Sequence, residues 1–205
     1  MDVILFNGSP NEKGCTYTGL TIIKDQLEAN GLTSEIVQVG REPVRGCVAC
    51  MGCRKTGECV FNDDSVNAAA KKLREAEGLI IGSAVHFAGA TGAAASFLDR
   101  LFFSIGRTSL KMKFGASIVS CRRGGATAAF DQLNKYFTIS QMPIVSSCYW
   151  NQIHGHTPEE VMKDAEGIRT LKVLANNMAY LIKCKNAASI PPPEEPEFVM
   201  TNFIR

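Results

Sequence analysis

The alternation of short apolar runs with helical segments is the feature that most limits how this chain can fold. Five runs are expected to form strands: Val3–Phe6, Ser34–Val39, Gly78–Val85, Phe114–Ser120 and Pro143–Ser147. The Gly78–Val85 run is almost continuously apolar, which is typical of a strand buried on both faces of a sheet. Strands that alternate with helices favour an α/β fold, a doubly wound parallel sheet with helices on both faces.

Segments with apolar residues at helical spacing follow these runs. They are Thr16–Ala29, Ser65–Glu75, Ser96–Ser104, Thr127–Phe137 and a long helix from Thr157 to about Lys183. Thr157 is suited to cap the last helix, with Pro158 at its first position and Glu160 at its third. Asp63 and Asp64 are suited to cap the helix from Ser65. The pattern therefore predicts five strands and five helices in one domain.

The length of 205 residues fits a single domain, which we place at 1–188, with a cysteine-rich loop at 40–63 inserted. Residues 189–205 are rich in Pro and Glu and are expected to form an extended tail. The net charge of +2 gives no reason to expect nucleic acid or an anionic membrane as a partner. No apolar run is long enough for a membrane span, and the first residues lack the pattern of a signal peptide. A cytoplasmic protein is expected.

The cysteine-rich loop carries four of the eight cysteines within thirteen residues, in the spacing C-x2-C-x2-C-x5-C. They are Cys47, Cys50, Cys53 and Cys59. Three interpretations stay open: a 4Fe–4S cluster on four thiolates, a structural zinc site, or free thiols. Zinc sites usually combine two C-x2-C pairs from separate turns, so the overlapping spacing favours the cluster. Outside the loop, Cys148 and Cys184 are expected to be small buried apolar residues.

Three loops follow the predicted strands at what should be one edge of the sheet, where α/β folds bind ligands. The segment from Gly8 to Thr16 enters a helix and could hold a phosphate on backbone N–H groups, although a simple helix cap would look similar. His86 and Phe87 stand beside small residues and could hold a flat ring. Arg122 and the glycines after it could face a flavin or nucleotide phosphate, or form a plain turn.

The chain resembles the flavodoxin-like NADPH-dependent FMN reductase superfamily. The resemblance rests on Ser9-Pro10 with Thr16, the cysteine block with Asp63-Asp64, the Ser83–Thr91 loop, Phe97-Leu98-Asp99-Arg100, Gln132-Leu133-Asn134, Met142, Tyr149-Trp150-Asn151 and Asn202-Phe203-Ile204-Arg205. The cysteine spacing is most similar to the iron–sulfur flavoprotein branch. Relatives often carry Pro where this chain has Ala84 and Tyr where it has His86, and Cys15 replaces a commoner Asn.

This resemblance implies a flavodoxin-like fold, FMN as cofactor, and a homodimer or homotetramer. It implies that the FMN phosphate is held by Ser9, Asn11, Cys15 and Thr16. The isoalloxazine ring would lie along Ala84, Val85, His86 and Phe87, with Arg122 and Gly124 on its other side. Because the cysteine loop follows the second strand, a cluster there should lie close to the flavin of its own or a neighbouring subunit.

The function expected from these features is an FMN-dependent oxidoreductase that uses NAD(P)H or a ferredoxin-like donor. Its acceptor would be a small molecule: a quinone, a flavin or a nitro compound. Flavin carries the chemistry in such proteins, so no catalytic side chain is assigned. One alternative is an electron carrier without its own small-molecule substrate, and another is a redox-sensing module without flavin. The pair Tyr149-Trp150 is expected to roof the flavin, lie at a subunit interface or fill the core.

Overall fold

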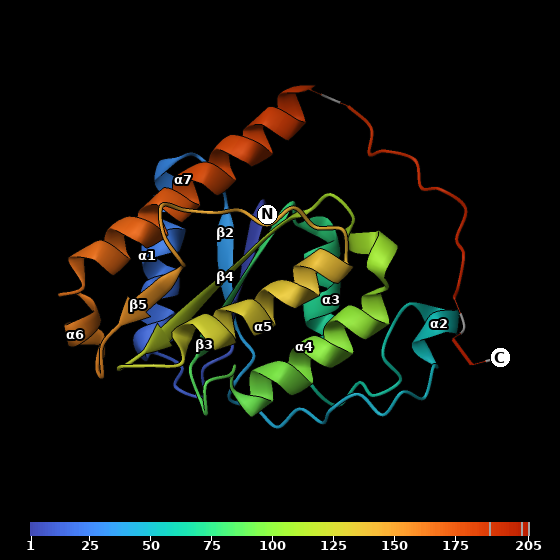
Figure 1. The fold of residues 1–205 in the computed structure, drawn as a ribbon, viewed down its shortest axis with the longest axis horizontal. Coiled ribbons are helices and arrows are strands. Elements are labelled where there is room, and N and C mark those ends of the chain that lie inside the picture. Colours follow the sequence, from blue (N-terminus) through green and yellow to red (C-terminus); the bar gives the residue numbers. More distant parts are fainter. Residues whose placement is uncertain (189, 202, 205) are drawn as a thin grey trace.

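The computed structural model describes residues 1–188, 190–201 and 203–204, and within them the chain forms one parallel sheet (Figure 1). The strands are β1 (Val3–Asn7), β2 (Ser34–Gln38), β3 (Gly78–Ala84), β4 (Phe114–Cys121) and β5 (Gln152–His154). They lie in the order β2-β1-β3-β4-β5, and each pairs with its neighbours in parallel. The predicted flavodoxin-like α/β fold is confirmed.

Helices cover both faces of the sheet. They are α1 (Cys15–Ala29), α2 (Cys53–Thr56), α3 (Val66–Glu75), α4 (Gly92–Ile105), the 3-10 helix η1 (Arg107–Leu110), α5 (Ala126–Ile139), α6 (Pro158–Val161) and α7 (Ala165–Ala188). The predicted cap is confirmed at α6, where the Thr157 side chain accepts a hydrogen bond from the Glu160 N–H. Across the described residues, none of the helices combines the length and apolarity needed to cross a membrane.

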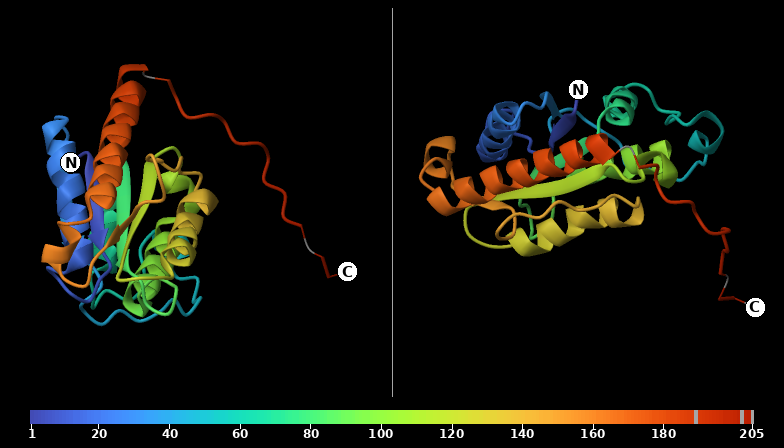
Figure 2. Two further views of the ribbon diagram at one scale, coloured as in Figure 1. Left: turned by 60° about the vertical axis from the view of Figure 1, so that its left-hand side comes forward. Right: turned by 90° about the horizontal axis from the view of Figure 1, so that it is seen from above.

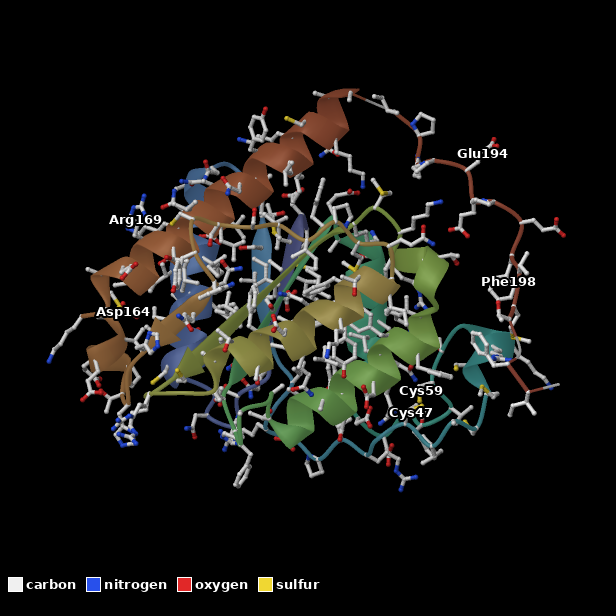
Figure 3. The ribbon with its side chains drawn as sticks, viewed as in Figure 1. Cys47, Cys59, Asp164, Arg169, Glu194 and Phe198 are labelled. Atoms are coloured by element: carbon white, nitrogen blue, oxygen red, sulfur yellow. The ribbon has the colours of Figure 1, made fainter. Side chains whose placement is uncertain are left out.

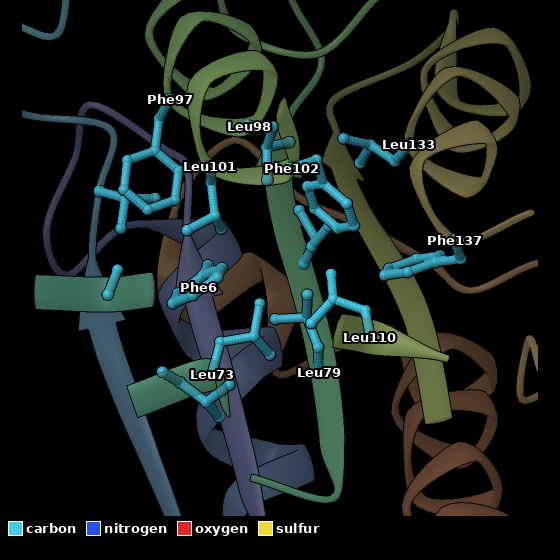
Figure 4. Close-up of a cluster of buried hydrophobic side chains, with 14 of the residues drawn as sticks. Phe6, Leu73, Leu79, Phe97, Leu98, Leu101, Phe102, Leu110, Leu133 and Phe137 are labelled. Atoms are coloured by element: carbon cyan, nitrogen blue, oxygen red, sulfur yellow. The ribbon is translucent and has the colours of Figure 1, made fainter. Parts of the chain in front are cut away.

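The strand β1 sends alternate side chains to two separate cores. Ile4 and Phe6 enter the cluster beneath α3, α4 and α5, whereas Val3 and Leu5 enter the cluster beneath α1 and α7. In the first cluster the rings of Phe6 and Phe97 meet edge to face, with their centroids 5.3 Å apart (Figure 4). This packing on both faces fixes the register of the sheet, because a shift by one residue would exchange the two sets.

Two predicted elements were wrong. The segment Pro143–Ser147 is no strand of the sheet: it makes a single bridge, from Ile144 to Gly115, and the chain then bends away. It returns as β5 and pairs with the end of β4.

The predicted long final helix is two helices, α6 and α7. The Asp164 side chain accepts a hydrogen bond from the Gly167 N–H at 2.9 Å, and this bond begins α7 as a separate helix. The cysteines Cys148 and Cys184 were predicted to be buried, and both are exposed.

The C-terminal arm, residues 190–201 with 203 and 204, has no helix or strand. Both views in Figure 2 show it leaving the end of α7 and projecting away from the body. Ser189, where we expected the tail to begin, and Asn202 and Arg205 of its last motif lie outside the described residues. The division into a domain and a tail therefore stays a prediction.

Candidate functional site

The carboxyl ends of β1, β3 and β4 meet at one hollow, and this is the candidate flavin pocket. It is lined by Ser9, Asn11, Cys15, Thr16, Ala84, Val85, His86, Ser120, Cys121, Arg122, Gly155 and His156. The hollow measures about 160 Å³ and adjoins an open one of about 740 Å³, with Asn11, Cys15 and His156 lining both. Ligand sites of small molecules typically measure about 300–1,000 Å³, so the two together offer sufficient room.

The buried amide of Asn7, the half-buried amide of Gln38 and the hydroxyl of Ser9 shape the loop after β1. The Asn7 side chain donates to Gln38 Oε1 at 2.6 Å and accepts from the Ser9 N–H at 3.2 Å. Gln38 in turn donates to the Ser9 carbonyl at 2.7 Å, and Ser9 Oγ accepts from the Asn11 N–H at 3.1 Å. These bonds connect the ends of β1 and β2 to each other and to Ser9, and Ser9 to Asn11 within the loop, so the loop is shaped before any ligand binds.

The first turn of α1 opens into this pocket and is suited to an anion. Its N-cap is Gly14, which has no side chain to occupy the free N–H groups, and no acidic residue lies in the first turn. Buried Thr16 shares a hydrogen bond with Ser120 across the pocket, with the two hydroxyl oxygens 2.8 Å apart. Free N–H groups at the positive end of a helix are a common phosphate site.

A strained turn forms the loop after β3. His86 and Gly89 exchange both backbone hydrogen bonds at 2.9 Å, which leaves Phe87 and Ala88 as the two central residues of a tight turn. Their φ angles are +50° and +58°, and residues other than Gly rarely adopt such backbone angles. The turn points the Phe87 ring into solvent, and Phe87 does not line the flavin pocket.

Two side chains hold this turn in place. Thr91 donates to the Gly8 carbonyl at 2.6 Å and accepts from the Ala94 N–H at 3.1 Å, so it links the loop after β1 to the start of α4. Gln132 Oε1 accepts from the Ala90 N–H at 2.9 Å. Hydrogen bonds therefore join the loops around the pocket to one another, in addition to the bonds within each loop.

The structure brings most of the predicted flavin residues to one pocket. Eight of the ten line it, and Phe87 and Gly124 do not. Four lining residues were missed by the sequence reading: Ser120, Cys121, Gly155 and His156. Ser120 ends the predicted fourth strand and Cys121 follows it directly, so their place at its carboxyl end was available as a signal. Gly155 and His156 follow β5, whose position was predicted incorrectly, so no signal for them was available.

The four clustered cysteines line a second pocket, the cysteine pocket. Its other lining residues are mainly apolar: Val48, Met51, Val60, Phe61, Arg100, Phe103 and Ser104. Figure 3 marks Cys47 and Cys59 beside α4. The loop leaves the carboxyl edge of the sheet after β2, but the cysteine pocket lies against the second half of α4. The two pockets share no lining residue.

A buried arginine faces the cysteine pocket. Arg100 is 1% exposed, and both its Nε and Nη2 lie 3.3 Å from Cys59 Sγ. It also forms an ion pair with buried Asp64 and donates to the Phe61 carbonyl at 2.9 Å. Burial alone would lower the pKa of Arg100, but the hydrogen bonds to Asp64 and Cys59 outweigh that effect and raise it. Asp64 also accepts the Val66 N–H at 3.1 Å, which bears out its predicted place at the start of α3.

The thiols of the cysteine pocket differ in how well they fit a single metal ion and a cluster. All eight cysteines lie in the described part of the chain and are free thiols. Among the described residues, no three His, Cys, Asp or Glu side chains surround a point at which one metal ion could sit. A zinc site needs such convergence, whereas a 4Fe–4S cube distributes its four thiolates over four iron atoms. Four thiols around one mainly apolar pocket, with a cation directed at one of them, fit the cluster better than the single ion.

The aromatic pair Tyr149-Trp150 lies apart from both pockets. The two rings meet at a centroid distance of 4.8 Å, and about half of each side chain is exposed. They line a separate hollow with Asp164 and Glu166, on the side of the molecule where Figure 3 labels Asp164 and Arg169. A place in the core is therefore excluded, and the pair does not line the flavin pocket of its own chain.

Comparisons with known proteins agree with this geometry. The sequence profile of the NADPH-dependent FMN reductase family matches residues 1–157. An iron–sulfur flavoprotein of Methanocaldococcus jannaschii is 28% identical over 191 residues, which cover 89% of this chain and 98% of the relative. An iron–sulfur flavoprotein of Archaeoglobus fulgidus is 28% identical over 176 residues, covering 84% of this chain and 86% of the relative.

Solved structures share the fold at low sequence identity. The crystal structure of RosB with bound 8-demethyl-8-formylriboflavin-5′-phosphate matches with a TM-score of 0.75 at 13% identity, over 100% of this chain and 92% of that chain. A flavodoxin from the domain Archaea matches with a TM-score of 0.59 at 16% identity, over 89% of this chain and 99% of that one.

Proposed function

The chain belongs to the NADPH-dependent FMN reductase family, in its iron–sulfur flavoprotein branch, and from this we propose what it binds and transfers. We propose that it binds FMN in the flavin pocket and a 4Fe–4S cluster in the cysteine pocket. It would pass electrons in the cytoplasm from NAD(P)H or a ferredoxin-like donor to a small acceptor such as a quinone, a flavin or a nitro compound. A homodimer or homotetramer is the proposed assembly.

The observation that carries the cluster proposal is the contact of Arg100 with Cys59. Two donors of one guanidinium are directed at a single sulfur, and hydrogen bonds from a cation are strongest when the acceptor is charged. Iron–sulfur clusters are ligated by thiolates. The buried cation therefore fixes the orientation of one proposed ligand, and the other three stand around the same pocket.

The FMN proposal rests on the pocket at the β1/β3 switch of the sheet. Ser9, Asn11, Cys15 and Thr16 would hold the phosphate beside the free N–H groups of α1. Ala84, Val85 and His86 would lie along the ring, and Arg122 at its edge. Phe87 and Gly124 would reach the flavin only after a movement of their loops. Bound FMN would supply two-electron chemistry and a cluster one-electron steps, while this chain would hold and orient both groups.

Anaerobic purification followed by an absorbance spectrum, iron and sulfide analysis, and EPR after reduction tests both cofactors. We expect one FMN per chain, and about four iron and four sulfide per chain for one cube. The variants Cys50→Ser and Cys59→Ser should lose the cluster signal and keep the flavin. The matched control is Cys184→Ser, an exposed thiol outside the block. An FMN-loaded protein that carries no iron after anaerobic purification would overturn the cluster proposal.

A second candidate, an electron carrier without its own substrate, is favoured by the names of the relatives, which specify cofactors and no substrate. Turnover with NAD(P)H and a soluble quinone separates the two candidates. Reduction by ferredoxin, with no reduction by either nucleotide, would favour the carrier. A protein purified without flavin would exclude both.

A further inference from the structure

The C-terminal arm divides into an acidic first part and an apolar second part. Prolines at 191–193 and 196 keep the chain extended, because the proline ring fixes φ and drives the preceding residue to extended backbone. Glutamates at 194, 195 and 197 follow. Next come Phe198, Val199 and Met200, each about four-fifths exposed. Phe203, which is 92% exposed, lies beyond them.

The start of the arm is anchored to the body. Lys111 Nζ donates to the Pro193 carbonyl at 2.6 Å and lies 3.3 Å from a Glu195 carboxylate oxygen. Gln141 donates to Glu195 at 3.0 Å. Phe198 lies beyond this anchor, where the arm runs clear of the body (Figures 2 and 3). The anchor gives the arm a direction, so its apolar part is presented outward at a defined place.

A surface of matching chemistry surrounds the cysteine pocket. Val48, Met51, Val60 and Phe103 are each about 40–60% exposed there and form an apolar patch. The cations of the cysteine loop are exposed around it: Arg45, Arg54 and Lys55. Glu58 is the single acidic residue of the segment 45–60, so the loop is cationic overall. An acidic segment followed by apolar side chains is complementary to this surface in both respects.

We propose that the arm of a second copy of this chain covers the cysteine pocket, with its Phe198 and Phe203 on the apolar patch and its Glu197, which lies beyond the anchor at Glu195, facing Arg54 and Lys55. The arm points away from its own body, so the second copy is the occupant rather than the same chain. The hollow at Tyr149 and Trp150 is also apolar in part, but Asp164 and Glu166 line it and would repel the arm. Reciprocal exchange of two arms closes a symmetric pair.

Photo-crosslinking of the full-length protein tests which chain the arm contacts. With Phe198→p-benzoylphenylalanine, we expect a crosslinked species of twice the chain mass, joined to peptides from 45–61 or 100–104. The matched control is Ile190→p-benzoylphenylalanine, an exposed position before the anchor, which should give no crosslink to those peptides. Crosslinks of Phe198 within one chain, or to the Tyr149-Trp150 region, would overturn the proposal.

Sedimentation analysis of the triple variant Phe198→Ser, Val199→Ser, Met200→Ser measures the same contact without a probe. We expect the triple variant to self-associate at least about tenfold more weakly than the natural chain. Added salt should weaken self-association further, because it screens the ion pairs between the arm and the loop. Ile190→Ser should associate like the natural chain. Circular dichroism should show that both variants fold, since these side chains are exposed in the single chain. Unchanged self-association of the triple variant would also overturn the proposal, whatever the flavin and iron contents prove to be.

Discussion

Arg100 holds Cys59 by two nitrogens of one guanidinium, Nε and Nη2, each 3.3 Å from the sulfur. The same guanidinium forms an ion pair with Asp64, which stands at the start of α3. One side chain of α4 therefore fixes the last cysteine of the loop and the helix that follows it.

The other three cysteines of the loop differ from Cys59. Within the described residues, none of them accepts a hydrogen bond from a buried cation. Cys50 instead stands between Ala49 and Met51, whose φ angles of +51° and +59° are unfavourable for residues with a side chain.

The substitution Arg100→Lys should destabilise the cluster-free protein by about 1–3 kcal/mol, because an ammonium keeps the charge but cannot reproduce the fork to Cys59 and Asp64. Iron content per chain should fall as well. Chemical denaturation and iron analysis measure the two effects. The matched control is Arg45→Lys. Arg45 is exposed, and its guanidinium lies above the Phe61 ring, as that of Arg100 does. We expect its free energy of unfolding to change by less than about 0.5 kcal/mol. Equal stability and iron for both variants would contradict the assigned role of Arg100.

The alkylation of Cys15 should depend on pH and on FMN. Burial raises the pKa of the Cys15 thiol, with a smaller contribution from Glu160 and Glu159. Because the thiolate is the reactive form, its alkylation by iodoacetamide should reach half of its maximal rate above the pH expected for an exposed thiol. Saturating FMN should slow the reaction at least about tenfold if Cys15 lies at the phosphate. Mass spectrometry of the labelled peptide measures the rate, and equal rates with and without FMN would count against that placement.

The same raised pKa has a consequence for stability. The folded state keeps the Cys15 proton at a pH at which the unfolded chain releases it, so folding is favoured below the unfolded pKa. This contribution is lost as the pH rises through the folded pKa. Cys15→Ala should therefore flatten the decline in unfolding free energy on the alkaline side. A decline that is identical in both proteins would contradict the assignment.

The substitution Ala88→Gly should stabilise the protein by about 0.5–1 kcal/mol, because glycine adopts the positive φ of the turn without the steric cost of a Cβ. Ala93→Gly is the control, since Ala93 lies in α4 with helical backbone. Glycine relieves no strain there, and we expect it to lower the free energy of unfolding. Thermal or urea unfolding measures both. A loss of stability at position 88 would mean that the strained turn has packing contacts that compensate for the strain.

The substitution Gly40→Ala should destabilise the protein by more than about 3 kcal/mol and weaken FMN binding. A Cβ at Gly40 would stand 2.3 Å from the Gly8 carbonyl oxygen and 2.7 Å from that of Ser9, and backbone cannot yield as a side chain does. Gly92→Ala is the matched control, because a Cβ there meets nothing within 4 Å. Flavin titration and denaturation measure the effects. A Gly40→Ala protein that binds FMN normally would show that the loop after β1 moves freely.

Much of the fold was predictable because buried parallel strands leave a strong apolar pattern. Gly78–Val85 and Phe114–Ser120 were placed within one residue of the observed strands. The edge strand β5 was not, since its three residues include one buried apolar side chain and resemble a loop. The break before α7 depends on Asp164 reaching Gly167, a local hydrogen bond that apolar spacing does not record.

The candidate site was predictable in part for a related reason. Loops after well-patterned strands could be placed at one edge, so Ser9, Thr16 and Ala84 were expected together. The role of Arg100 was not predicted, although the motif containing it was noted. Its partners lie 36 to 41 residues earlier in the chain, and no local pattern reveals a contact over that separation. The path of the cysteine loop along α4 was missed for the same reason.

The dependence of Arg100 on the cysteine loop also constrains how such a chain can have evolved. All the groups that satisfy this buried guanidinium in the described residues belong to the segment 59–64. A chain that lost the loop, residues 40–63, would keep the ion pair of Arg100 with Asp64, but Nε and Nη2 of this buried guanidinium would lose their partners Cys59 and Phe61, at a cost of about 1–3 kcal/mol. Loss of the insertion should therefore favour replacement of this arginine by a residue with fewer donors, because only its bond to Asp64 would remain satisfied.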